Sequence, residues 1–258
     1  MPSVTVSLIQ THTHWHDPVA NRAMFDIWLQ DVPSEADLVV LPEMFTTGFT
    51  MASAAVAEPM RGDTAAWLTD TARALGKTIC GSVVIEDAGR YFNRLLWVSP
   101  DGAVRHYDKR HLFRMAGETN HYTPGDRRVI VELNGLRICL AVCYDLRFPV
   151  WLRSRDDYDV LLVVANWPAA RIAAWMTLLR ARAIENLAYV VGVNILGTDG
   201  AGVEYTGGSA VYDAEGRALL EPSNKAEVAT VVLDLGVLAE YRAAFPAWRD
   251  ADEFELEV

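Results

Sequence analysis

The chain has 258 residues, with 23 Lys and Arg against 34 Asp and Glu, so its formal net charge is −11. Hydrophobic residues make up 51% and charged residues 22%, a composition that excludes general disorder and allows a substantial core. The negative charge argues against nucleic acid or an anionic membrane surface as a partner, and no apolar stretch reaches the roughly 18 residues of a membrane span. Three cysteines (Cys80, Cys139 and Cys143) cannot all pair, so we expect a reducing, cytoplasmic location.

Apolar runs and helical patterns alternate along the chain. The first half predicts a strand, a helix that Asp17 and Pro18 open, a second strand, a helix that Asp63 caps, and then hairpin strands. The order starts again at Leu136 with a strand, a short helix, a strand, a long helix and further hairpin strands. The predicted helices are 18–29, 63–74 and 169–187, and the predicted strands are 4–10, 37–43, 78–85, 91–98, 103–107, 136–143, 160–165, 188–195, 209–212, 217–220 and 228–233.

This repeated order predicts two similar halves, each a sheet with helices on one face. The two bare sheet faces are buried most simply against each other. We therefore expect an α/β fold, a four-layer α-β-β-α sandwich of two stacked mixed sheets with pseudo-two-fold halves. No linker-like stretch divides the chain, so residues 1–258 are predicted to form a single domain.

The strongest local signal is the segment LRICLAVCYDLRFP, in which an apolar strand runs directly into Cys143. A thiol at a strand end before a short helix can use backbone N–H groups to hold an oxyanion. The alternative is a buried structural cysteine, as we expect for Cys139. Arg147, four residues beyond the candidate nucleophile, is interpreted as a structural ion-pair partner.

Two other polar residues follow predicted strands. Glu43 ends a buried strand in DLVVLPEMFTTGF, where burial would raise its pKa and suit a general base. Lys109, in YDKRHLF, could supply a fixed positive charge. The alternatives are that Glu43 is a carboxylate at the rim paired with an arginine and that Lys109 is a solvated surface lysine. Because Glu43 and Cys143 are interpreted as occupying equivalent places in the two halves, we expect the pseudo-two-fold stack to bring them together.

Together the motifs LPEMF, DKRHLF and CYDLRFP resemble those of the nitrilase superfamily, the carbon–nitrogen hydrolases. The resemblance extends over essentially the whole chain. It implies a catalytic triad of Glu43, Lys109 and Cys143, with Glu118 as a second family glutamate. It also implies the α-β-β-α sandwich and a homodimer.

Within the family, the chain looks most similar to the bacterial omega-amidases, on the segments LPEMFTTGF, KRHLFRM, CYDLRFPVW, ANWP and RARAIEN. True nitrilases usually have tryptophan after the nucleophile, where this chain has Tyr144. The resemblance implies hydrolysis of 2-oxoglutaramate or 2-oxosuccinamate to the 2-oxo acid and ammonia. Another amidase, a nitrilase or an N-carbamoyl amino acid hydrolase with the same triad is the alternative.

The implied mechanism is covalent and needs no metal or cofactor. Cys143 attacks as a thiolate, Glu43 acts as general base, and the oxyanion is held by Lys109 and the backbone N–H of Tyr144. The Lys109 cation is expected to lower the pKa of Cys143 from about 8.5 toward neutrality. Glu118 is expected to orient Lys109 or the amide.

A small anionic amide needs a local cation in an acidic protein. Arg171, at the start of the long predicted helix, is the candidate carboxylate clamp, since a guanidinium binds a carboxylate through two parallel hydrogen bonds. Trp167 and Phe45 are candidate pocket walls. A solvated arginine and plain core aromatics are the alternatives.

Three other functions remain open from the residues alone. Alternating histidines could form a metal site on one strand face (His12, His14 and His16). Cys143 could pair with His111 or His121 in a protease-like dyad. The chain could also be a binding scaffold without catalysis.

Overall fold

The computed structural model describes residues 2–255 and contains two large mixed sheets and a two-stranded ribbon. The first sheet has the strand order β15 (Glu227–Asp234), β1 (Ser3–Gln10), β2 (Leu38–Val40), β4 (Thr78–Asp87), β5 (Arg90–Val98) and β6 (Val104–Asp108), with β3 (Glu58–Pro59) also paired to β4. The second has the order β14 (Ala218–Leu220), β13 (Ala210–Tyr212), β10 (Tyr189–Val193), β9 (Val160–Val164), β8 (Leu136–Val142) and β7 (Ile130–Leu133). The ribbon pairs β11 (Leu196–Thr198) with β12 (Glu204–Thr206).

The two large sheets repeat one strand pattern. In the first, β1, β2 and β4 are parallel, β15 is antiparallel beside β1, and β5 and β6 continue antiparallel beyond β4. In the second, β8, β9 and β10 are parallel, β7 is antiparallel beside β8, and β13 and β14 continue antiparallel beyond β10. The predicted pseudo-two-fold halves are therefore confirmed.

The expected equivalence of Glu43 and Cys143 is wrong. Glu43 follows β2, the second strand of its half, whereas Cys143 follows β8, the first strand of the other half. By strand order, the counterpart of the β2 end is the end of β9, where Asn166 lies. The two catalytic candidates therefore come from non-equivalent strand ends. The prediction rested on strand-end position alone, and the order of strands within each sheet cannot be read from the sequence.

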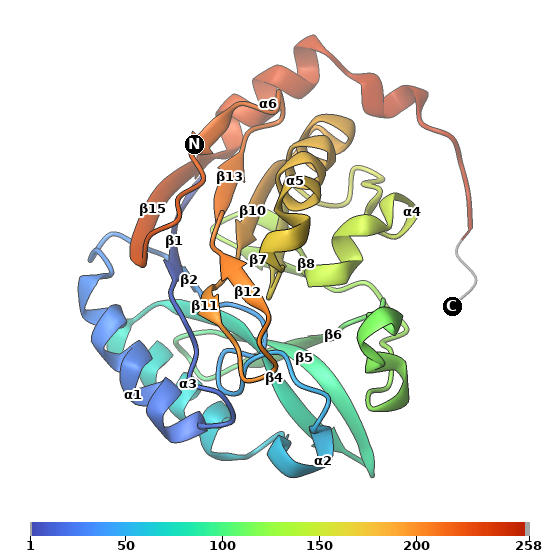
Figure 1. Ribbon diagram of the computed structural model, residues 1–258. Helices are drawn as coiled ribbons and strands as arrows, with labels where there is room; N and C mark the ends of the chain where they lie inside the picture. The colour runs from blue at the N-terminus through green and yellow to red at the C-terminus, as the bar shows by residue number, and fades with distance from the viewer. Residues whose placement is uncertain (1, 256–258) are drawn as a thin grey trace.

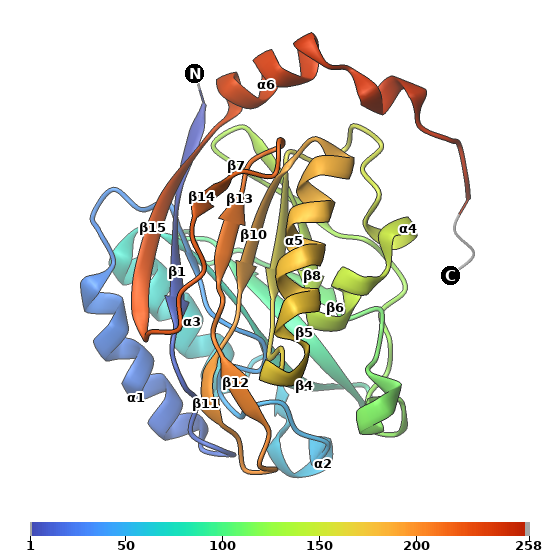
Figure 2. The same ribbon diagram turned by 45° about the horizontal axis from the view of Figure 1, so that its top comes forward.

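Helices cover the outer faces of both sheets, which completes the predicted four layers (Figures 1 and 2). On the first sheet lie α1 (Pro18–Trp28) and α3 (Asp63–Leu75), and on the second lies α5 (Ile172–Asn186) with α4 (Pro149–Leu152) beside it. The remaining helices are α2 (Ser53–Val56) and α6 (Leu235–Ala244), and short 3₁₀ turns span Leu29–Asp31, Arg114–Ala116, Glu118–Asn120, Cys143–Arg147, Ala169–Arg171 and Ala247–Asp250. Among residues 2–255, no helix has the length and apolar character needed to cross a membrane.

Apolar burial holds the layers together. Side chains of both sheets share one buried cluster, in which Leu8 of the first sheet joins Leu140 and Val163 of the second. A second cluster packs the first sheet against its helices and includes Phe25 and Phe45. Because strands leave the shared core at one edge, the polar residues that follow them converge there.

Candidate active site

Four ionisable side chains predicted from separate segments lie together in the structure. Glu43 follows β2, Lys109 follows β6, Cys143 follows β8, and Glu118 begins a 3₁₀ turn. The side chains of Lys109 and both glutamates are fully buried, and Cys143 is 9% exposed. Charged groups are buried in this way only when they are paired.

Lys109 is the centre of the cluster. Its Nζ donates to Oε1 of Glu43 at 3.0 Å and to both carboxylate oxygens of Glu118 at 3.0 Å. Glu43 is held by two further donors, Nδ2 of Asn93 to Oε1 at 2.7 Å and the backbone N–H of Asn166 to Oε2 at 2.7 Å. These bonds fix the orientation of the carboxylate.

The buried charges change one another's proton affinity. Burial by itself lowers the pKa of Lys109, but the carboxylates of Glu118 and Glu43 outweigh it and raise that pKa above its usual value, so the ammonium stays charged. Burial raises the pKa of Glu118; Lys109 opposes this shift, and the negative charge of Glu43 adds to it.

Cys143 lies in a tight turn directly after β8. Its φ is +47°, in the left-handed region that side chains rarely adopt, and its Sγ lies 3.9 Å from the backbone oxygen of Asn166. Burial and then the Glu43 carboxylate raise the pKa of the thiol well above its usual value, and Lys109 only partly opposes them. The expected lowering of this pKa is therefore wrong, since sequence analysis gave no measure of burial. A raised pKa favours the protonated thiol, so a base beside the sulfur would assist its attack.

A cavity of about 320 Å³ opens onto Cys143 and Lys109. Its walls are largely aromatic and apolar, as in most small-molecule sites. Trp167, Tyr144 and Arg171, which the sequence analysis had singled out, all line it. The other lining residues are Trp15, Phe49, Thr50, Met51, Phe113, Ala116, Arg147, Asn166, Pro168, Asp199, Ala201, Val203 and Tyr205.

The structure does not place Phe45 in this cavity. Its ring packs edge-on against Phe25 at 5.4 Å and beside Trp67 at 5.9 Å, in the core between the first sheet and its helices. The preceding Met44 has a φ of +42°, so the chain turns sharply there. Phe49, four residues later, takes the position on the cavity wall that had been expected for Phe45.

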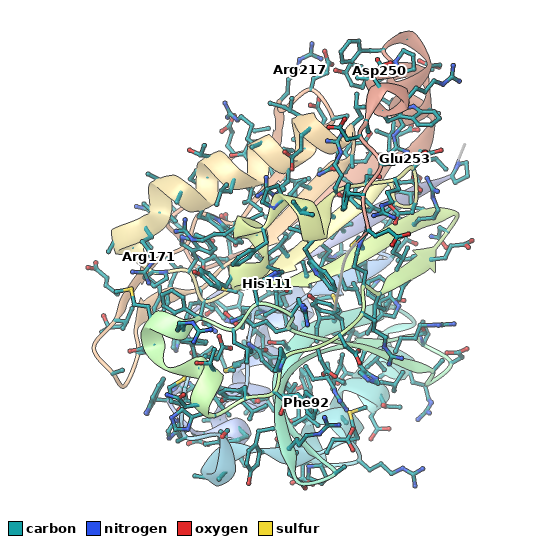
Figure 3. All side chains as sticks on the ribbon, turned by 90° about the vertical axis from the view of Figure 1, so that its right-hand side faces the viewer. Phe92, His111, Arg171, Arg217, Asp250 and Glu253 are labelled. Carbon is teal, nitrogen blue, oxygen red and sulfur yellow. The ribbon has the colours of Figure 1, made fainter. Side chains whose placement is uncertain are left out.

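Two arginines face the cavity. The guanidinium of Arg171 lies 5.1 Å from the ring centre of Phe113, and that of Arg147 lies 4.9 Å from the ring centre of Trp167. Neither makes a salt bridge within the described part of the chain. The expectation that Arg147 is an ion-pair partner is therefore wrong. Figure 3 shows Arg171 beside the N-terminal end of α5.

The β11–β12 hairpin supplies one wall of the cavity that the sequence analysis missed. Asp199 shapes it, because Oδ1 accepts from the backbone N–H of Val203 and Oδ2 from the hydroxyl of Tyr205, both at 2.9 Å. The Asp199-Gly200 pair is a common hairpin turn and could have indicated this ribbon. The hydrogen bonds of Asp199 satisfy its carboxylate within the hairpin.

The histidines do not assemble the two alternative sites. His16 bonds Oγ1 of Thr50 through Nε2 at 2.8 Å, and residues 2–255 contain no group of three or more His, Cys, Asp or Glu that could hold a metal ion. Nδ1 of His111 lies 2.8 Å from Oδ1 of Asp145, so its ring is committed to that carboxylate rather than to Cys143. His121 is exposed.

The fold and the buried Glu–Lys–Cys cluster define a carbon–nitrogen hydrolase, and the model of the carbon-nitrogen hydrolase family matches residues 5–243. The chain belongs to this family. It is 48% identical to the omega-amidase YafV of Escherichia coli K12 over 99% of this chain and 100% of that protein. It is 31% identical to a 2-oxoglutaramate amidase of Bacillus subtilis 168, covering 95% of this chain and 96% of that one. A CN-hydrolase superfamily protein of Xanthomonas campestris, solved with an arsenic adduct in its active site, is 48% identical with a TM-score of 0.97 and full coverage of both chains.

Proposed function

We propose that this chain is an omega-amidase that hydrolyses the terminal amide of 2-oxoglutaramate or 2-oxosuccinamate to the 2-oxo acid and ammonia. The observation that carries the proposal is the contact of Lys109 with Glu43 beside Cys143, at a cavity that two unpaired arginines face. The 48% identity to an omega-amidase over the full length supports the substrate class.

In the first step Glu43 removes the proton of the Cys143 thiol as the sulfur attacks the amide carbon. The raised pKa of this thiol makes that proton transfer necessary, and the fixed Glu43 carboxylate is placed to accept it. The S–C bond forms while the carbonyl π pair moves to oxygen. The ammonium of Lys109 and the backbone N–H of Tyr144 stabilise the resulting oxyanion.

In the second step the C–N bond breaks and Glu43 returns the proton to the departing ammonia. A thioester remains on Cys143. Water then attacks the thioester carbon with Glu43 again as base, the S–C bond breaks, and the free acid and the thiol are regenerated. Each proton that Glu43 accepts is returned, so the cycle closes without a cofactor.

Glu118 completes the charge balance around Lys109. Both of its carboxylate oxygens accept from Nζ, and its Oε2 also accepts from the backbone N–H of Phe113. This arrangement supports a role in holding Lys109 toward the oxyanion, with no direct part in proton transfer.

The carboxylate of the substrate is assigned to Arg171. The guanidinium of Arg171 lies over the Phe113 ring, and such a cation–π contact leaves its N–H groups available for a carboxylate. Trp167 forms the neighbouring wall and orients the carbon chain. Arg147 adds a second positive charge to the same cavity.

Other amidases and N-carbamoyl amino acid hydrolases with the same triad are the alternative function. A panel of 2-oxo acid ω-amides, simple amides, N-carbamoyl amino acids and nitriles, assayed for ammonia or product release, tests the proposal. We expect the highest kcat/KM for 2-oxoglutaramate or 2-oxosuccinamate. A higher value for an N-carbamoyl amino acid or a simple amide refutes the substrate assignment.

The proposal includes a homodimer of single-domain subunits that acts in the cytoplasm. The shared core of the two sheets supports the single domain. Light scattering on the purified protein tests the dimer, and cell fractionation tests the location.

A further inference from the structure

Asp145 lies two residues after Cys143 and is fully buried, yet the proposed reaction gives it no task. Burying a carboxylate costs free energy unless hydrogen-bond donors surround it. Donors surround the Asp145 carboxylate. Its Oδ2 accepts from the backbone N–H of Val142 at 3.0 Å and the hydroxyl of Tyr107 at 2.8 Å, and its Oδ1 accepts from the backbone N–H of His111 at 2.9 Å.

These partners flank two of the proposed catalytic residues. Val142 immediately precedes Cys143, while Tyr107 and His111 lie two residues before and two residues after Lys109. One carboxylate therefore joins the chain that carries the nucleophile, in the second sheet, to the chain that carries the lysine, at the edge of the first. In Figure 3 His111 lies between the yellow-green ribbon of the second half and the teal ribbon of the first.

Aromatic packing and further bonds keep this junction rigid. The ring of His111 stacks on Phe148 at 3.7 Å between centroids and meets Asp145 through Nδ1 at 2.8 Å. Burial and the neighbouring Asp145 charge raise the pKa of Tyr107 well above its usual value, so its hydroxyl remains a donor. Nε1 of Trp151 in turn donates to that hydroxyl at 3.2 Å.

The nucleophile needs such support because its backbone is strained. The left-handed φ of Cys143 persists only if the surroundings determine it, and Asp145 holds the turn through Val142. From the other side, Arg182 of α5 donates to the backbone oxygen of Leu146 in the same turn at 2.8 Å.

The geometry points to Asp145 as a positioning residue that sets the distance between the Cys143 thiol and the Lys109 ammonium through Val142, Tyr107 and His111. It touches no substrate. This inference rests on the proposed function for its effect on kcat, but the reactivity of the thiol can be measured without an amide substrate.

The test is Asp145→Asn in the full chain. An amide at this place puts its NH₂ against the backbone N–H of either Val142 or His111, whichever way it is turned. We expect kcat for 2-oxoglutaramate to fall about 100-fold with KM changed by less than about threefold, since a misplacement of about 1 Å has this effect. The rate of Cys143 alkylation by iodoacetamide, followed by peptide mass, should fall about tenfold or more. Cys143 is 9% exposed and lines the cavity, whereas Cys80 and Cys139 are 0% and 1% exposed.

Asp159→Asn is the matched control. Asp159 is also buried, but its carboxylate is bonded to Arg137 and Arg242 and not to the segments that flank Cys143 and Lys109. Asp159→Asn should lower Tm while kcat and alkylation stay at wild-type values.

Tyr107→Phe removes only one hydroxyl and is the second test variant if Asp145→Asn does not fold. It should lower kcat about tenfold with KM unchanged. The inference is overturned if folded Asp145→Asn or Tyr107→Phe keeps kcat and alkylation within about twofold of wild type. A wild-type protein that is inactive on the ω-amides but alkylated faster than Asp145→Asn refutes the proposed function alone.

Discussion

The role of Glu43 as the general base gives the sharpest prediction, tested by Glu43→Gln. The change preserves shape but removes the proton acceptor, and general base catalysis contributes about 10²–10⁴-fold. We therefore expect kcat to fall by about that factor in a continuous assay of ammonia release.

The structure also gives the cost in stability. Oε1 of Glu43 accepts from Asn93 and Lys109, and Oε2 accepts from the backbone N–H of Asn166. The NH₂ of glutamine must face one of these donor sets, which leaves at least one buried donor unpaired at about 1–3 kcal/mol. For a chain of this size each kcal/mol lowers Tm by roughly 2–4 °C.

The matched control is Glu58→Gln. Glu58 accepts from the backbone N–H of Thr64 at 2.7 Å, whereas the carboxylates bonded to Lys109 are those of Glu43 and Glu118, so the loss of the Glu58 charge should lower Tm without lowering kcat. Folded Glu43→Gln protein that keeps more than about a tenth of the wild-type kcat would refute Glu43 as the base.

Three further predictions test the site and the fold. Cys143→Ala should lower kcat on the order of 10⁶-fold with a native melting curve, whereas Cys139→Ala should lower Tm and retain kcat; measurable turnover by Cys143→Ala would exclude the thioester route. Arg171→Met should lower kcat/KM for 2-oxoglutaramate about 10–100-fold but leave a neutral short-chain amide unchanged, and an equal loss on both would contradict the clamp. Asp159→Asn should lower Tm at pH 7, and the difference in Tm between wild type and variant should shrink as the pH of the melts decreases. Burial raises the pKa of Asp159, but hydrogen bonds from Arg137 hold it below its usual value. The stabilisation by Asp159 therefore exists above the unfolded-state pKa of about 3.9 and is lost as pH falls through the folded-state pKa. A gap that persists in acid would contradict this reasoning.

Local signals predicted the reactive cluster well. Cys143 directly follows the apolar strand β8, Glu43 lies three residues after the apolar strand β2, and Lys109 directly follows the more polar β6. The ends of the apolar strands are positions that a sequence reveals through hydrophobic patterning. The repeated order of strands and helices likewise indicated the stacked sheets. What the pattern could not supply was strand order within a sheet, and the mistaken equivalence of Glu43 and Cys143 arose there.

The errors concern properties that depend on the path of loops and on burial. Phe45 and Phe49 are both aromatic residues of one loop, which has left-handed residues at Met44 and Gly48, so the path of the loop decides which ring reaches the cavity. The pKa of Cys143 depends on how burial and Glu43 together compare with Lys109, and the sequence contains no such measure. The β11–β12 hairpin was missed because each of its strands has only three residues.

The charge of the cavity explains how a protein of net charge −11 can take an anionic substrate. The charged residues that line the cavity are Lys109, Arg147, Arg171 and Asp199. The buried Glu43 and Glu118 carboxylates behind it hold Lys109 and bring the formal sum of these six groups to zero. Lys109 is already committed to two carboxylates, so it can stabilise an oxyanion but offers no net attraction for the distant substrate carboxylate. We therefore assign that attraction to Arg147 and Arg171, which lie over aromatic rings and make no salt bridge among residues 2–255. In the proposed function, the buried Glu–Lys–Cys cluster would carry out the chemistry of the amide, and the two arginines would select an anionic one.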